Sequence, residues 1–170
     1  MSAYSNYQLE ILKRKEFGLS PKPIESSEIL NEIIEDIKRN NSKTRKKSLN
    51  NLIFNTLPGT TPAAKVKAEF LKDIIVNVEN VEEISIDFAF ELLSHMKGGA
   101  SIRVLLDIAF SNNKILAIKA SHILKTQVFL YDADTNRLKI EYKKGKKIAK
   151  EILASYCKAE FFTRLPAVPK

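Results

Sequence analysis

Apolar side chains recur every three or four residues along most of this chain, with polar residues between them. The clearest case begins at Ser27, from where isoleucines and leucines share one helical face as far as Ile37. Its apolar positions are Ile29, Leu30, Ile33, Ile34 and Ile37. This is the 3.6-residue period of an amphipathic helix packed against a core. Because the chain shows no sustained period-two alternation and no Asn-Gly hairpin signal, the pattern predicts an all-α fold.

The same period predicts further helices. We place them over residues 4–17, 49–56, 62–76, 86–97, 101–110, 114–130 and 146–162. Residues 40–47 are interpreted as a polar, basic connector. Connections of a few residues favour antiparallel neighbours, so we expect stacked helical hairpins in a single domain that spans residues 1–170. No internal repeat of fixed length is present, so periodicity by itself does not predict a solenoid.

Turn residues mark the ends of several predicted helices. Gly18 follows the first helix, where a left-handed conformation is easiest for glycine. Thr61 and Pro62 form a helix start, because threonine accepts hydrogen bonds from free amides and proline loses no needed donor at the first helical position. Tight structural corners are predicted at Pro58, Gly59, Gly98 and Gly99.

The charge balance is basic, with 28 lysines and arginines against 20 aspartates and glutamates and a formal net charge of +8. Two basic runs are each either a solvated helix face or a contact surface for phosphates. Their candidate anion or RNA contacts are Arg39, Lys43, Arg45, Lys46, Lys47, Lys143, Lys144, Lys146, Lys147 and Lys150. Only Tyr142 supplies an aromatic ring within these runs, so RNA binding there would be electrostatic, salt-dependent and poor in sequence selectivity.

Residues suited to catalysis or metal binding are few. Glu91 and His95 have a helical spacing that suits two metal ligands, but a third ligand is not evident. His122 has no assigned acid or nucleophile partner. The run from Asp132 begins like a calcium loop, yet Lys143 stands where a bidentate carboxylate is required. We expect Asp132 instead to cap a helix that contains Leu138 or to bond to nearby backbone. We therefore assign this chain no catalytic residue, metal site or cofactor.

Cysteine content and the absence of long apolar runs bear on the cellular compartment. Cys157 is the only cysteine, which excludes an internal disulfide and a cysteine-only metal site. The first residues lack the charged start and apolar run of a signal peptide, and every apolar run is shorter than the roughly 18 residues of a membrane span. These features predict a cytoplasmic protein without membrane contact.

Four segments together resemble the amino-terminal, HEAT-like helical domain of the aconitase B family. They are residues 90–102 (FELLSHMKGGASI), 55–61 (NTLPGTT), 131–133 (YDA) and 155–162 (SYCKAEFF). The likeness runs from about Tyr7 to Phe162. It implies a HEAT-like α-α superhelix, with residues 164–170 at the start of a linker to a catalytic core that is absent from this chain.

The resemblance also implies a role. Members of this family, aconitate hydratase 2 and in some cases 2-methylisocitrate dehydratase, interconvert citrate and isocitrate in the tricarboxylic acid cycle. They use a [4Fe-4S] cluster that three cysteines hold in the catalytic domains. A chain with Cys157 alone is therefore expected to be inactive by itself. The implied role is domain docking, protein contact and shaping of substrate access.

The partners that the resemblance implies are the catalytic domains of the parent enzyme, a second copy in a homodimer, and RNA bound by the cluster-free enzyme. The alternative hypothesis is a free-standing basic helical protein that binds RNA or another anionic partner through the two basic runs.

Overall fold

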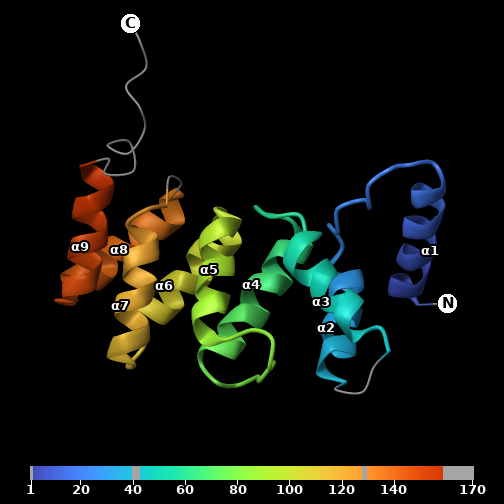
Figure 1. Cartoon of the computed structure of the whole chain (residues 1–170). Helices are drawn as coiled ribbons and strands as arrows, with labels where there is room; N and C mark the ends of the chain where they lie inside the picture. Colours follow the sequence, from blue (N-terminus) through green and yellow to red (C-terminus); the bar gives the residue numbers. More distant parts are fainter. Residues whose placement is uncertain (1, 40–42, 128–129, 159–170) are drawn as a thin grey trace, which may run out of the picture. The chain divides into compact units, whose positions relative to one another are not determined.

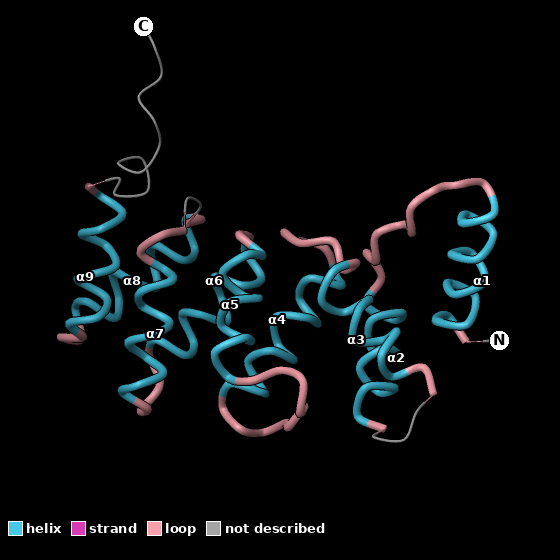
Figure 2. Tube along the Cα trace, viewed as in Figure 1, coloured by secondary structure: helices cyan, strands magenta, loops and turns pink. Residues whose placement is uncertain are grey.

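The structure is a computed structural model that describes residues 2–39, 43–127 and 130–158. Within these ranges the chain forms nine α-helices and a single isolated β-bridge (Figures 1 and 2), which confirms the all-α prediction. The chain divides into two compact units, Met1–Leu92 and Leu93–Lys170, and the division falls inside α5 (Ile86–Met96). In the described ranges, no helix is both long enough and apolar enough to cross a membrane.

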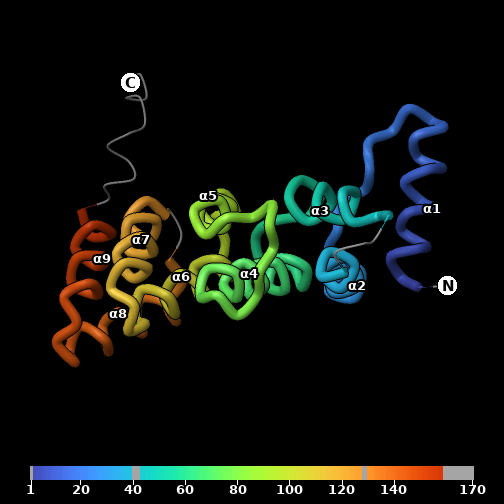
Figure 3. Tube along the Cα trace, turned by 60° about the horizontal axis from the view of Figure 1, so that its bottom comes forward, coloured from blue at the N-terminus to red at the C-terminus, as the bar shows by residue number. Residues whose placement is uncertain are grey.

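Helix α2 (Ser27–Lys38) is the centre of the first unit. It packs against α1 (Ala3–Glu16), α3 (Arg45–Phe54) and α4 (Pro62–Ile75), and Figure 3 shows it between α1 and α4. The predicted apolar stripe of α2 supplies much of the core. Its buried side chains are Leu30, Ile33, Ile34 and Ile37. A parallel bridge between Ile24 and Thr56 joins the segments before α2 and after α3.

The second unit contains α6 (Gly99–Ala109), α7 (Lys114–Leu124), α8 (Asp132–Lys143) and α9 (Lys147–Cys157). Consecutive helices pack in pairs, α6 on α7 and α8 on α9, and α7 also contacts α9 (Figure 1). Buried residues from every one of these helices form the core. They include Val104, Leu105, Ile108, Ala120, Leu124, Leu138, Ala149 and Ile152. The paired packing is compatible with helical hairpins, and the HEAT-like superhelix stays a prediction.

Several helix boundaries differ from the prediction. Helix α3 begins at Arg45, so Arg45, Lys46 and Lys47 are helical and do not belong to the connector. Helix α7 ends at Leu124 and not near residue 130. Helix α8 contains Leu138, where a helix was expected but its bounds were not, because it buries only Leu138 and therefore shows no apolar period. Its N-cap is Tyr131 and not Asp132, which is the first residue of the helix. The final helix is described as far as Cys157, and residues 159–162 of its predicted range lie outside the described residues.

The residue with a left-handed backbone is a glycine at two of the predicted turns and a lysine at a third. Gly18 and Gly59 have left-handed φ angles of 67° and 97°. Gly98 has an extended backbone with a φ of −147° and caps α6, so that helix begins at Gly99, two residues before the predicted Ser101. The left-handed residue at this corner is Lys97, with a φ of 43°.

Candidate interaction surfaces

The first basic run is divided between two environments. Lys43, Lys46 and Lys47 are exposed. Arg45 is directed into the unit, where its Nε donates a hydrogen bond of 3.0 Å to the carbonyl of Ile37. Its guanidinium also pairs with both carboxylate oxygens of Glu83, at 2.5 and 2.9 Å. Arg45 thus ties the start of α3 to the end of α2 and to the segment before α5.

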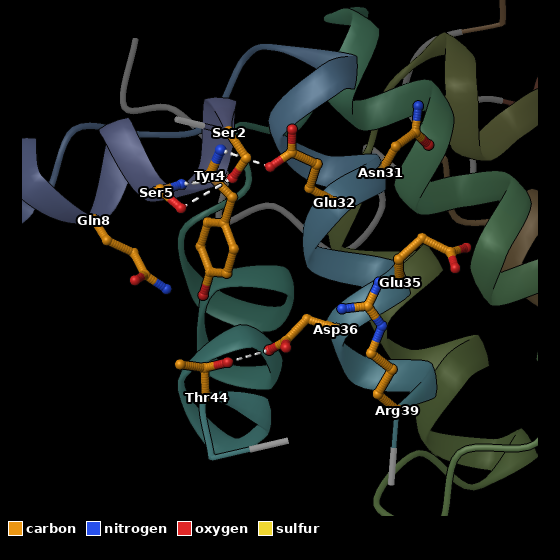
Figure 4. Close-up of a pocket in the computed structure, with 10 residues that line it drawn as sticks. All are labelled: Ser2, Tyr4, Ser5, Gln8, Asn31, Glu32, Glu35, Asp36, Arg39 and Thr44. Atoms are coloured by element: carbon orange, nitrogen blue, oxygen red, sulfur yellow. Dashed lines mark hydrogen bonds between the residues drawn. The ribbon is translucent and has the colours of Figure 1, made fainter. Parts of the chain in front are cut away.

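Arg39 lies at a polar hollow of about 520 Å³ between α1 and α2 (Figure 4). Three carboxylates line the hollow, those of Glu32, Glu35 and Asp36. The carboxylate of Glu32 accepts hydrogen bonds from the main-chain amides of Tyr4 at 2.9 Å and Ala3 at 3.1 Å, which lower its pKa. Because these amides are among the free donors of the first turn of α1, Glu32 caps that helix from α2.

Asp36 belongs to a hydroxyl network at the same hollow. Its Oδ2 accepts hydrogen bonds from Ser48 at 2.5 Å and Thr44 at 2.8 Å. Since Ser48 donates its proton to Asp36, the Tyr4 hydroxyl donates to Ser48 Oγ, at 2.9 Å. These bonds join α1, α2 and α3. Glu32 and Asp36 are therefore engaged in holding helices together, and we assign no catalytic role to the hollow.

The second basic run follows α8, the turn at residues 144–146 and α9. Lys144 and Lys146 pair with Glu141 at 2.8 and 3.0 Å, and these hydrogen bonds lower the pKa of the Glu141 carboxyl. Lys147 lies 4.0 Å from the carboxylate of Glu151. Lys143 and Lys150 are exposed and form no ion pair with any described residue. The run therefore contains both paired and unpaired lysines.

Lys146 has a further structural role. Its Nζ donates to the carbonyl of Phe110 at 3.2 Å and lies 5.0 Å from the centroid of the Phe110 ring. Arg137 of α8 also lies over this ring, at 5.6 Å, and pairs with Asp107 at 2.7 Å. The two cations connect the end of α6 with α8 and with the turn before α9, mainly by electrostatic attraction to the ring and the carboxylate.

Sequence reasoning missed Lys67, a buried cation in α4. Its side chain donates a hydrogen bond of 2.9 Å to the carbonyl of Ile53, and the residue is 5% exposed. Burial lowers its pKa to about 8. Helical spacing could have predicted this burial, because Lys67 lies three residues after Ala64 and four before Leu71 and therefore shares the buried face of α4.

The remaining candidate residues occupy helix ends or exposed positions. Asp134 lies in the first turn of α8, where its carboxylate accepts a hydrogen bond from the amide of Tyr131 at 3.2 Å. His95 and His122 are exposed, and so is Cys157 at the end of α9. In the part of the chain that the structure describes, no three His, Cys, Asp or Glu side chains are grouped to hold a metal ion.

Comparison with known proteins places this chain among aconitase sequences. Residues 6–162 match the family described as the aconitate B N-terminal domain. Aconitate hydratase B of Escherichia coli is 30% identical over 166 residues, which cover 95% of this chain and 18% of that protein. Aconitate hydratase B of Helicobacter pylori is 29% identical over 157 residues, 92% of this chain and 18% of that protein. The chain thus spans about a fifth of the length of these relatives.

Proposed function

Because this chain belongs to the aconitase B family and matches its N-terminal domain, we propose that it is a non-catalytic helical domain that docks against the catalytic domains of an aconitate hydratase. The match over residues 6–162 is the observation that carries this proposal. In this role the domain offers rigid helical surfaces for protein contact and shapes the approach of citrate or isocitrate to the active site of the parent enzyme.

The cofactor expected of the parent does not fit this chain. A [4Fe-4S] cluster of this type needs three cysteine thiolates, and the 170 residues contain only one cysteine, Cys157. Its side chain is exposed at the end of α9. We therefore place the cluster, and the dehydration and rehydration that it supports, in the other domains of the parent.

Association and turnover test the proposal directly. The purified chain is mixed with the separately produced, cluster-loaded catalytic portion, and binding is followed by calorimetry and size-exclusion chromatography. We expect a complex, and its absence at about tens of micromolar, which corresponds to binding weaker than roughly −6 kcal/mol, would contradict a docking role. The chain alone should not convert citrate to aconitate. Light scattering of the chain alone tests the further proposal of a homodimer.

A second candidate function is binding of RNA or another polyanion. The exposed lysines of both basic runs favour it, in particular Lys43, Lys46, Lys47, Lys143 and Lys150, none of which has an ion pair within the described residues. Binding would be steeply salt-dependent because it releases counterions. No gel shift of RNA at low ionic strength, or an unchanged shift after substitution of the lysines at 143, 144, 146 and 147, would contradict this function.

A further inference from the structure

The positive charge of the chain is distributed unequally between its two units. Residues 93–170 contain 15 lysines and arginines against 6 aspartates and glutamates, whereas residues 1–92 contain 13 against 14. The net charge of +8 is therefore made of +9 on the second unit and −1 on the first. An asymmetry of this kind favours an acidic partner for the second unit and steers its approach.

Exposed lysines and apolar side chains lie next to each other on α8. Lys139 and Lys143 are one helical turn apart and exposed, with no ion pair to any described residue. At about 100° per residue, Ile140 and Tyr142 lie on either side of this row. They are 54% and 48% exposed. The solvent face of α8 therefore combines cations with apolar surface that no described residue of the second unit covers.

Helix α9 adds two more exposed lysines. Lys147 and Lys150 lie in its first turns, and α9 packs directly on α8. The turn between the helices is fixed because Lys146 contacts both Glu141 and Phe110. We call the exposed side chains of this pair the hairpin surface. It consists of Lys139, Ile140, Tyr142, Lys143, Lys147 and Lys150.

The composition of the hairpin surface favours a protein partner over a nucleic acid. The side chain of Ile140 cannot stack on a base, whereas apolar groups with a charged rim are the usual arrangement of a protein interface. The cations are all lysines, which lack the bidentate geometry that arginine offers to phosphate. Glu151 lies beside Lys147 and would repel a phosphate backbone, but a protein partner can pair with both signs of charge.

We propose that the hairpin surface is the docking site for the catalytic portion of the parent enzyme, and that the catalytic portion meets it with an acidic face around an apolar patch. The inference rests on the proposed docking function. It is supported by the position of this domain in the family. The domain is N-terminal, and the relatives have about four fifths of their length outside the matched region. In the relatives that remainder follows the N-terminal domain, so a parent of the same layout would tether it to the end of this domain, where the α8–α9 hairpin lies.

Two charge-reversal variants with the same change in net charge test the site. The first is Lys139→Glu with Lys143→Glu and Lys150→Glu on the hairpin surface. The matched control is Lys43→Glu with Lys46→Glu and Lys47→Glu, which changes exposed lysines of the first unit. Binding to the cluster-loaded catalytic portion is measured by calorimetry at several salt concentrations, with circular dichroism to verify folding. A third variant, Ile140→Ala, examines the apolar contact without changing charge.

We expect the hairpin variant to weaken binding by about tenfold or more and the control by less than about twofold. The affinity of the hairpin variant should also depend less on salt, and Ile140→Ala should weaken binding at every salt concentration. Equal effects of the two reversals, or no effect of the hairpin variant, would overturn the inference while leaving docking itself intact. The inference would also be overturned if the hairpin variant lost binding to RNA but bound the catalytic portion as tightly as the unaltered chain. No complex with the unaltered chain would contradict the proposed function, and the inference with it.

Discussion

The ammonium group of Lys67 in α4 donates a hydrogen bond of 2.9 Å to the main-chain carbonyl of Ile53 in α3. That carbonyl is one of the last four of α3, which have no partner within their own helix. The lysine thus satisfies an acceptor at the negative end of the α3 dipole. Lys67 forms no ion pair with any described residue, so this carbonyl offsets only part of the cost of burying its charge.

This burial predicts that stability rises with pH above neutrality. The pKa of Lys67 is lowered from 10.5 to about 8 in the folded chain. Between these values the unfolded chain binds a proton that the folded chain has released, so the free energy of unfolding increases from about pH 8 toward 10.5. Lys67→Met should flatten this increase. It should also raise the unfolding free energy at pH 7 by about 1 to 2 kcal/mol, because the gain from removing the buried charge exceeds the loss of one hydrogen bond.

Urea denaturation of both chains at steps between pH 7 and 10 measures this effect. A matched control is Lys65→Met on the exposed face of the same helix, which should leave the pH profile unchanged. A flat profile for the unaltered chain would contradict the assignment.

The raised pKa of Tyr7 has the opposite effect at higher pH, where it makes the free energy of unfolding fall. Burial, together with the charges of Glu10 and Tyr4, raises the pKa of Tyr7 to about 12 from 10.0. The stabilisation is fully present below pH 10 and is lost as the pH rises through 12, because the unfolded chain releases its proton first. Tyr7→Phe should remove this decline. It should cost about 1 kcal/mol at pH 7, because the hydroxyl no longer donates its 2.7 Å hydrogen bond to the carbonyl of Lys22.

Ultraviolet absorbance of the tyrosinate, recorded alongside the unfolding transition, separates this titration from that of Lys67. A decline that persists in Tyr7→Phe would assign it to another group.

We predict that replacing Ser121 by alanine stabilises the chain. Its residue is 3% exposed, and its hydroxyl has no hydrogen-bond partner among the described residues. Removing a buried, unsatisfied hydroxyl recovers its desolvation cost, so Ser121→Ala should raise the unfolding free energy by about 1 kcal/mol. The matched control is Ser155→Ala, which is equally buried but donates to the carbonyl of Lys125 at 3.2 Å and should destabilise. Thermal unfolding compares the two, and a loss of stability in Ser121→Ala would contradict the prediction.

The sequence predicted the helices that have a complete apolar face. Helices α2 and α4 have such faces and reach their predicted ends to within about one residue. The bounds of helix α8 were not predicted, because Leu138 is its one buried side chain and its other contacts include polar pairs, those of Arg137 with Asp107 and of Glu141 with its lysines. These contacts leave no period to detect in the sequence, since they depend on partners from other helices or turns.

The candidate surfaces could be predicted only in part, for the same reason. Lysine and arginine runs are visible in the sequence, but their availability depends on partners far along the chain. Arg45 meets Glu83, 38 residues away, and Lys146 meets Phe110, 36 residues away. Lys143 and Lys150 belong to the same run as Lys146 and remain exposed. Local sequence does not distinguish the paired cations from the unpaired ones.

The pairing of Arg45 with Glu83 is strong enough to measure by a double-mutant cycle. The guanidinium side chain is 13% exposed and the carboxylate 45% exposed, so solvent screens the pair only partly. We expect a coupling energy of about 0.5 to 1 kcal/mol from Arg45→Met, Glu83→Gln and the double variant.

Arg45→Lys should recover little of this coupling energy, because a lysine cannot bridge both carboxylate oxygens. The exposed Lys47→Met should change stability by less than about 0.5 kcal/mol. Urea denaturation at low and high salt measures the unaltered chain and these five variants, and a coupling energy of zero at low salt would show that the bidentate contact does not hold α3 to the segment before α5.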